Sequence, residues 1–326
     1  MNAVDHNNVV IFDDRGIPSI MCRFVRPKDT EEVPAVFKIG DKVADAIYIS
    51  KYPNIVIDGR AYSMPMADPT VNITFDEAVQ ACRCKGLGWH LMTAVEYEYL
   101  LNQSREKGTM PHGNTDWGKD YYHNEEQGKV SNLGRTYTGT GPVTWNHDHT
   151  PYGVSDLNGN VWEWLAGLRI KDGVIEFIPG NKAASPYCDL SKDSTEWQQA
   201  ETSKGPVRAN VECGEITITD AVAADDYEPN YDGVRIEELE VKLSEIPQVL
   251  KDLGIIPDKR AEEEGKTYVY FDATEGEYLP FRGSAFISTS SSGPSALGLI
   301  LPRSHSHVYI GFRSAFYEVN GKLITE

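Results

Sequence analysis

The 326-residue chain has few cysteines, little positive charge and no long apolar run. Its five cysteines are scattered and odd in number, so they predict neither a disulfide framework nor a zinc-binding pair. Only 31 lysines and arginines stand against 49 acidic residues, and the resulting net charge of −18 argues against binding to nucleic acid or to an anionic membrane surface. No window approaches the ~18 apolar residues of a membrane span, so we expect no membrane insertion.

The first residues lack the basic segment and the apolar core of a secretory signal. We therefore expect a protein that is made soluble in the cytoplasm. It would reach a virion or a cell surface by a route other than a Sec leader. Residues 1–44 are expected to form a short β-rich N-terminal arm, and docking of the protein to a virion or another particle is part of this expectation.

The elements expected next are those of a mixed α+β domain. Alternating apolar and polar residues around turn signals predict paired strands over residues 45–62. Two capping boxes, each a threonine followed three residues later by a glutamate, predict helices that begin near Phe75 and Ala94. Gly108 should end the second helix. Residues 109–152 are rich in turn-forming and aromatic residues and predict long ordered loops.

An acidic insertion is expected over residues 170–265. Residues 212–240 within it hold ten acidic residues and one basic residue, Arg235. The stretch VRIEELEVKLSEIPQVLKDLG has apolar residues at helical spacing, with a break and a restart near Ser244 and Pro247. The following TYVYFDA predicts a strand.

The last segment differs in composition from the rest of the chain. Residues 282–317 contain no aspartate or glutamate, although 49 of the 326 residues are acidic. Residues 285–309 also contain no lysine, methionine, glutamine, tryptophan or asparagine. Serine, glycine, leucine, isoleucine and histidine dominate, and the apolar share is too high for a flexible linker. We call residues 282–317 the tail.

Sequence motifs for catalysis or metal binding are scarce. Two HxH pairs, His147 with His149 and His305 with His307, would each place two imidazoles on one face of a strand, which suits zinc. A third ligand cannot be assigned, and the alternative is that these are surface or hydrogen-bonded histidines. The chain has no GxSxG elbow, GxGxxG loop, P-loop or HExxH helix, so no catalytic residue is predicted.

Residues 153–164, GVSDLNGNVWEW, carry the most specific signal. They resemble the GVYDMxGNVWEW signature of the formylglycine-generating-enzyme-like (sulfatase-modifying-factor-like) domains, a branch of the C-type lectin fold. The segments IYISKY, VNITFDEAVQAC, GWHLMTAVEYEYL, FRGSAF and IGFRSAFY resemble further motifs of that family in the same order. The resemblance implies an α+β domain with the C-type lectin fold over residues 45–326, interrupted by the insertion.

The same resemblance raises the alternative of an oxidase or modifying enzyme. The family's oxidase activity needs cysteines in the segment that follows the FRGS motif, where a copper-bound thiol pair activates oxygen. Residues 285–313 contain no cysteine, so the soft ligands of such a site are missing. We therefore expect no enzymatic activity.

The tail resembles a second subfamily of this fold, the variable proteins of diversity-generating retroelements. In this subfamily, template adenines are copied with random bases. The pattern of the subfamily fits residues 282–315 without a gap. Fifteen positions match its fixed letters: Arg282, Gly283, Gly293, Ala296, Leu297, Leu299, Arg303, Ser304, Ser306, Ile310, Gly311, Phe312, Arg313, Ser314 and Ala315. Eleven positions align with template asparagines and are the predicted ligand-binding residues: Ala285, Ile287, Ser288, Ser291, Gly298, Ile300, Leu301, His305, His307, Val308 and Tyr309.

The codon chemistry agrees with this resemblance. Asparagine codons end in a pyrimidine, so random first and second bases cannot give Lys, Met, Gln, Glu or Trp, and none of these occurs in residues 285–309. A serine-rich loop of low complexity is the alternative. The resemblance implies a hypervariable, non-enzymatic protein from a phage, virus or similar mobile element. Its partner would be a protein ligand or cell-surface receptor.

A face that tolerates random side chains needs a scaffold that does not depend on them. Four interleaved apolar residues are expected to be buried, with the WEW sequence behind them: Leu297, Leu299, Ile310 and Phe312. Three arginines are expected to fix loops through carbonyls or carboxylates: Arg282, Arg303 and Arg313. The exposed side chains should form a mostly apolar patch, with Tyr309 and the two histidines as anchors.

One cofactor remains open at this stage, a calcium ion on the turn before WEW. The resemblance to the oxidase branch implies that its ligands would be the Asp156 and Glu163 carboxylates and the Gly159 and Val161 carbonyls. The alternative is a turn closed by Asp156 alone, with Glu163 paired to an arginine. A calcium-dependent lectin is accordingly the third functional interpretation, although the tail lacks acidic residues.

Overall fold

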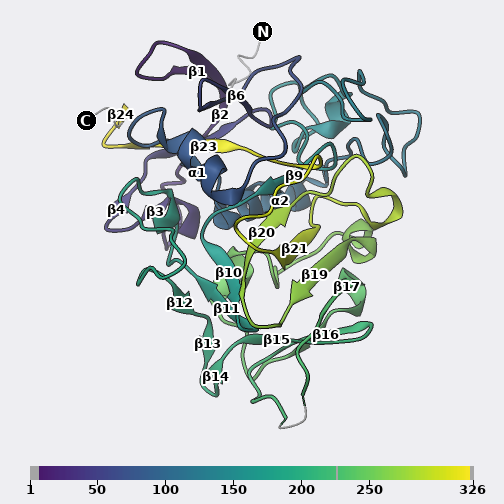
Figure 1. Cartoon of the computed structure of the whole chain (residues 1–326). Coiled ribbons are helices and arrows are strands. Elements are labelled where there is room, and N and C mark those ends of the chain that lie inside the picture. Colours follow the sequence, from purple (N-terminus) through teal and green to yellow (C-terminus); the bar gives the residue numbers. More distant parts are fainter. Residues whose placement is uncertain (1–6, 225–226, 324–326) are drawn as a thin grey trace.

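The computed structural model describes residues 7–224 and 227–323, and two large sheets dominate this part of the chain. The smaller sheet lies in the upper part of Figure 1. Its strands, in spatial order, are β1 (Asn8–Phe12), β2 (Pro18–Val25), β5 (Ala46–Ser50), β23 (Ser314–Val319) and β24 (Lys322–Leu323), with β8 (His90–Leu91) paired to β23. Because Met21–Val25 of β2 pair with β5, the strands β1 and β2 of the segment predicted as an N-terminal arm belong to the domain's own sheet.

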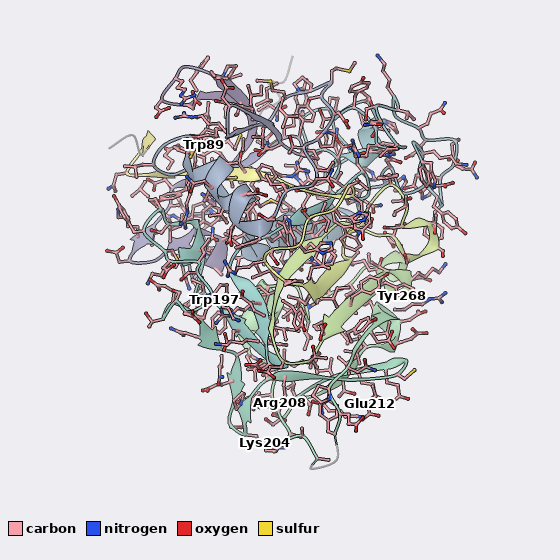
Figure 2. The ribbon with its side chains drawn as sticks, in the orientation of Figure 1. Trp89, Trp197, Lys204, Arg208, Glu212 and Tyr268 are labelled. Carbon is pink, nitrogen blue, oxygen red and sulfur yellow. The ribbon has the colours of Figure 1, made fainter. Side chains whose placement is uncertain are left out.

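The larger sheet runs from the middle to the bottom of Figure 1. Its main path is β17 (Tyr231–Arg235), β19 (Tyr268–Asp272), β21 (Leu297–Leu301), β20 (Glu277–Arg282), β10 (Leu168–Lys171), β11 (Val174–Phe177), β15 (Arg208–Glu212), β16 (Glu215–Thr219) and β18 (Glu240–Lys242). Beside this path lie β9 (Trp162–Trp164), β12 (Gln198–Gln199) and β22 (Ile310–Phe312). The expected insertion thus extends the sheet that carries the tail. Arg208 and Glu212 mark β15 near the bottom, whereas Trp89 lies near the smaller sheet (Figure 2).

Both predicted helices are present with the predicted starts. They are α1 (Phe75–Arg83) and α2 (Ala94–Lys107), and each has a complete capping box at its N-terminus. Gly108 ends α2 in the left-handed conformation at φ 65°. Three short hairpins complete the strands: β3 (Lys38–Ile39) with β4 (Lys42–Val43), β6 (Ile55–Ile57) with β7 (Arg60–Tyr62), and β13 (Glu201–Thr202) with β14 (Gly205–Pro206).

One secondary-structure prediction is wrong. The stretch from Val234 was expected to be helical, but it contains the end of β17, a 3-10 turn and β18 before α3 (Gln248–Asp252) restores the helix. Val234 is buried opposite Val269 of β19, and β18 pairs in parallel with β16. Strand pairing and burial therefore override the helical spacing of the apolar residues. The predicted strand TYVYFDA and the loops over residues 109–152 are confirmed.

The core has two main parts. The larger cluster joins α2 to both sheets, and the second lies under the tail around Trp162 and Trp164. Within the described residues, no helix combines the length and apolar character needed to cross a bilayer.

Candidate ligand-binding face

The tail is built around the WEW strand β9. β22 runs parallel to β9, with Ile310 opposite Trp162 and Phe312 opposite Trp164. β20 lies antiparallel on the other side of β9, and β21 then pairs with β20. The tail therefore begins at the end of β20, on one side of β9, and reaches the other side of β9 with β22. The WEW sequence thus lies beside the tail in the same sheet, and its two tryptophans share a buried cluster with Ile310 and Phe312.

Burial separates the fixed positions of the tail from the predicted ligand-binding positions. Twelve of the fifteen fixed positions are buried, whereas only two of the eleven predicted ligand-binding positions are buried. The four expected scaffold residues are each at most 1% exposed: Leu297, Leu299, Ile310 and Phe312. Most of the fixed positions therefore belong to the core, and most of the interleaved predicted ligand-binding positions reach the surface.

Two of the predicted ligand-binding residues do not reach the surface. Ala285 is 0% exposed and belongs to the cluster under the tail. Gly298 is buried on β21, and a Cβ atom at this position would overlap the ring of Phe281. Neither residue offers a side chain to a ligand in this chain, which reduces the accessible part of the predicted set to nine residues.

Three of the nine lie in or just before a 3-10 turn, Thr289–Ser291. Ile287 is 39% exposed, and Ser288 and Ser291 are half-buried. The loop 109–152 holds this turn in place, because the backbone N–H of Trp117 donates to the Phe286 carbonyl at 2.8 Å. The two aromatic rings also meet edge to face at 5.2 Å.

The other six are half-buried and lie at the end of β21 and in the loop before β22: Ile300, Leu301, His305, His307, Val308 and Tyr309. The ring of His307 lies 3.8 Å from that of Tyr309 and stacks parallel to His305 at 6.2 Å. Arg135 donates to the Val308 carbonyl at 3.1 Å, which fixes the loop from outside the tail. We call the nine accessible residues the tail face.

The histidines of the two HxH pairs lack the surroundings of a zinc site. His147 is buried and accepts from the Val154 N–H at 2.9 Å, and burial lowers its pKa to about 4. His149 donates to the Met110 carbonyl at 3.1 Å. Burial also lowers the pKa of His305. Among residues 7–224 and 227–323, no group of three or more His, Cys, Asp or Glu side chains is placed to hold a metal. The structure thus favours hydrogen-bonded and surface histidines.

The tail arginines fix loops as expected. Arg282 donates to the Glu98 carboxylate at 2.9 Å and to the Ser295 carbonyl. Arg303 donates to the Glu277 carboxylate at 2.8 Å and to the Leu190 carbonyl at 3.1 Å. In both cases a tail residue is tied to a distant segment through a charge-assisted hydrogen bond.

Arg313 decides between the two interpretations of the WEW turn. Its guanidinium donates to both carboxylate oxygens of Glu163, at 2.9 and 2.7 Å, and both side chains are almost completely buried. Asp156 instead accepts from the Gly139 N–H at 3.0 Å, and burial raises its pKa to about 6. A guanidinium thus neutralises one of the two carboxylates that calcium would need, and the other is destabilised as an anion. These residues do not fit calcium. The pairing of Glu163 with an arginine matches the alternative, but Asp156 binds the loop at Gly139 instead of closing the turn.

The cysteines give no support to thiol chemistry. All five are free, and three of them are buried: Cys22, Cys82 and Cys188. Burial raises the pKa of Cys22 to about 12 and that of Cys188 to about 11, which keeps both thiols protonated and unreactive.

Sequence reasoning missed the residues outside the tail that border the tail face. Tyr122 donates from its hydroxyl to the Ser290 carbonyl at 2.9 Å. Tyr270 on β19 contacts Trp162 edge to face and stacks with Tyr268, which Figure 2 shows at the side of the sheet. The aromatic content of 109–152 and the strand TYVYFDA were visible in the sequence, but their proximity to the tail depends on sheet order.

A scan against family models matches residues 51–207 to the sulfatase-modifying factor enzyme 1-like domain. A curated relative, the formylglycine-generating enzyme of Mus musculus, is 36% identical over 105 residues, which are 30% of this chain and 27% of that protein. The chain thus spans about a quarter of that relative's length. The family-model match ends before the tail face.

Similar solved structures include the Major Tropism Determinant P3c variant, with 13% identity and a TM-score of 0.34 over 96% of this chain and 61% of that chain. PvdO from Pseudomonas aeruginosa has 13% identity and a TM-score of 0.36 over 95% of this chain and 98% of that chain. Treponema denticola variable protein 1 has 11% identity and a TM-score of 0.36, with the same coverage. The family-model match over residues 51–207 agrees with the resemblance of the segment GVSDLNGNVWEW to the formylglycine-generating-enzyme-like domains.

Proposed function

We propose that this protein is a non-enzymatic binding protein that recognises a protein ligand through the tail face. One observation carries the proposal: twelve of fifteen fixed tail positions are buried, but only two of the eleven positions aligned with template asparagines are. Ile300, Leu301 and Tyr309 still pack against the edge of the cluster under the tail, whereas Ile287 and Val308 do not. The accessible positions can therefore change with at most a partial loss of core contacts. This is the arrangement that diversification by a retroelement requires.

The chemistry of the tail face supports a protein ligand. It contains no carboxylate or lysine, and most of its side chains are apolar or aromatic. The core of a protein interface is depleted in charge in the same way and enriched in aromatic residues. His307 and Tyr309 pack against each other, so they are partly ordered before a ligand arrives and lose little entropy on binding.

The tail resemblance supports a further proposal about the biological setting. We place the protein on a virion or another particle of a phage or virus, or at a cell surface, after synthesis as a soluble cytoplasmic protein. Its partner would be a receptor on a target cell. This setting explains the need for variation, because receptors differ between target cells.

The locus provides the direct test of diversification. We expect a near-copy of the codons for residues 285–309 beside the gene, differing only where the copy has adenine, together with a reverse transcriptase. Absence of such a copy would refute diversification and leave the fold unaffected.

A protein-level test uses the same division of the tail. Replacing Ile287, Ile300 and Val308 together by serine should abolish ligand binding, while the melting midpoint falls by only a few degrees because these side chains are exposed or half-buried. The control Leu299→Ser buries a hydroxyl in the core and should destabilise the fold strongly. If the triple variant unfolds as readily as the control, the three residues belong to the scaffold.

An oxidase of the same fold is the second candidate, and the family-model match and the mouse relative favour it. It would require thiol-dependent oxygen uptake or binding of copper(I). We expect neither, because residues 285–313 contain no cysteine. Oxygen uptake that iodoacetamide abolishes would establish the enzyme.

A further inference from the structure

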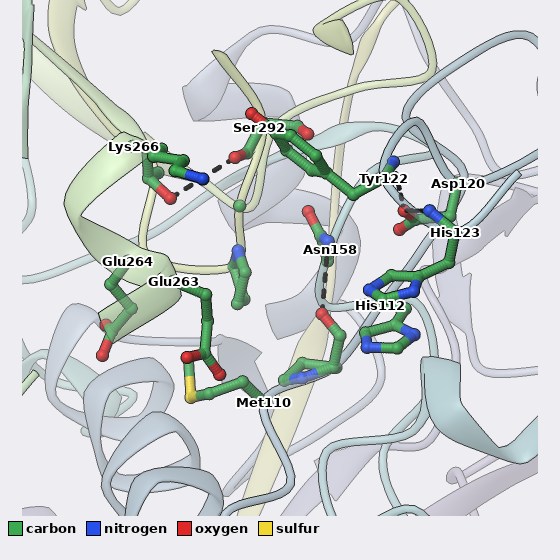
Figure 3. A pocket seen from close by; sticks show the side chains of 14 residues that line it. Met110, His112, Asp120, Tyr122, His123, Asn158, Glu263, Glu264, Lys266 and Ser292 are labelled. Carbon is green, nitrogen blue, oxygen red and sulfur yellow. Dashed lines mark hydrogen bonds between the residues drawn. The ribbon is translucent and has the colours of Figure 1, made fainter. Parts of the chain in front are cut away.

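A cavity of about 430 Å³ lies beside the tail and is separate from the tail face. The loop residues His112 and His123 form one side of it, Glu263 and Lys266 form the other, and Met110 lies at the bottom of the view beneath Glu263 (Figure 3). The tail contributes Ser292, Gly293 and Pro294, and none of these three is a predicted variable position. The cavity therefore keeps its shape whatever residues the variable positions carry.

The loop side of the cavity is held rigidly. The buried Asp120 carboxylate accepts three backbone N–H groups, those of Gly113, Tyr122 and His123, at 2.8–2.9 Å. Asn158, which is 6% exposed, donates to the Pro111 carbonyl at 3.2 Å. Each of these bonds fixes backbone that lines the cavity, so little ordering is needed when a ligand enters.

Two imidazoles form a flat surface in this wall. The rings of His112 and His123 are parallel within 6° and 3.7 Å apart. His112 is fixed through Nδ1, which lies 3.0 Å from the Glu126 carboxylate, and Glu126 also accepts from the Trp145 indole at 3.0 Å. A planar group can stack on such a surface.

One carboxylate of the lining, that of Glu263, is free to meet a cation. Three lining residues are carboxylates, Asp120, Glu263 and Glu264, whereas Lys266 is the one ammonium group in the lining. Asp120 is occupied by backbone N–H groups, and Glu264 pairs with Arg105 at 2.9 Å. Glu263 is exposed and has no hydrogen-bond or ion-pair partner within the described ranges 7–224 and 227–323. It can therefore accept a cationic ligand directly.

We propose that this cavity binds an arginine side chain of the protein partner. Met110, Pro111 and Pro294 supply apolar surface for the methylene stem. The guanidinium is planar and cationic, so it suits both the stacked imidazoles and the Glu263 carboxylate. This inference rests on the proposed function, and it adds a constant subsite to a variable face.

The test titrates the full chain with the peptide acetyl-Gly-Arg-Gly-amide and follows the imidazole resonances of His112 and His123 by NMR. We expect saturable shifts of both rings, and no saturable shift with the citrulline peptide, which has the same shape without the charge. Glu263→Gln should weaken binding about two- to fivefold, as expected for an exposed ion pair. Lys266→Gln should strengthen binding by a similar factor, because it removes a like charge.

Glu262→Gln is the matched control, since Glu262 lies on the same 3-10 turn, is exposed and does not line the cavity. It should leave binding within twofold of the wild type. The proposal is overturned if the citrulline peptide binds equally well, if Glu262→Gln and Glu263→Gln act alike, or if an acetyl-Gly-Glu-Gly-amide peptide binds instead and is weakened by Lys266→Gln. The peptide contacts no variable position, so any of these results would leave the tail face proposal standing.

Discussion

Glu163→Gln is the substitution for which the structure gives the clearest magnitude. The Glu163 carboxylate accepts two hydrogen bonds from Arg313, whose guanidinium also donates to the Ser50 and Lys51 carbonyls at 2.8 and 3.0 Å. Arg313 is 0% exposed, so after the substitution its charge is buried with carbonyl dipoles alone. Breaking one partner of a buried pair costs about 3–5 kcal/mol in the free energy of unfolding.

The assay is thermal unfolding in calcium-free buffer. An unfolding entropy of about 2.1 cal/mol/K per residue gives about 0.7 kcal/mol/K for this chain, so the melting midpoint should fall by about 4–7 °C. Glu240→Gln is the control, because its pair with Lys242 is more than half exposed and should contribute little to stability.

A different result would show that Arg313 is not the main partner of the Glu163 carboxylate. If Glu163→Gln were no more destabilising than Glu240→Gln, and if added calcium raised the melting midpoint of the wild type but not of the variant, Glu163 would be a calcium ligand. The assignment of the WEW turn made above would then be refuted.

Two further substitutions test a buried carboxyl group before the WEW strand and the packing of β21. Burial raises the folded pKa of Asp156 to about 6, above an unfolded value of about 3.9, so the folded state binds more protons between these values and stability falls as pH rises through this window. Asp156→Asn should remove up to about 3 kcal/mol of this fall in the free energy of unfolding. Denaturant unfolding of the wild type and the variant at pH 4 and pH 7 measures the difference. Equal pH dependence of the two proteins would contradict a raised pKa for Asp156. Gly298→Ala should cost about 1–3 kcal/mol in the same assay at neutral pH, because the new methyl group overlaps the Phe281 ring, whereas Ser306→Ala at an exposed position of the tail should be neutral. A neutral Gly298→Ala would show that the ring can move and that position 298 can vary.

The sequence was most informative where local rules and motifs act. Both capping boxes placed helix starts correctly, because a cap depends on residues only three positions apart. The apolar residues Leu297 and Leu299 were correctly predicted to be buried without any knowledge of the sheet, although Gly298 between them is buried as well.

Features set by distant partners could not be predicted in this way. The strands over 231–242 depend on pairing with β19 and β16, and their apolar spacing alone resembles a helix. Gly298 fits the pattern of a variable position, yet its burial comes from Phe281, which lies on the neighbouring strand β20. The cavity beside the tail needs Asp120 and Glu263 on opposite walls, and no spacing in the sequence indicates that proximity.

The position of β23 has a consequence for synthesis. This strand covers the edge of β5, which lies more than 260 residues earlier in the chain. In the same sense, β22 covers an edge of β9. A chain that stops or shifts reading frame within the tail would leave both edges open, and unpaired strand edges are templates for aggregation. Copying errors in the tail are therefore coupled to misfolding of the whole molecule, whereas simple exchanges of surface side chains are not. A chain with a truncated or frame-shifted tail would therefore be lost to misfolding before it could bind a ligand.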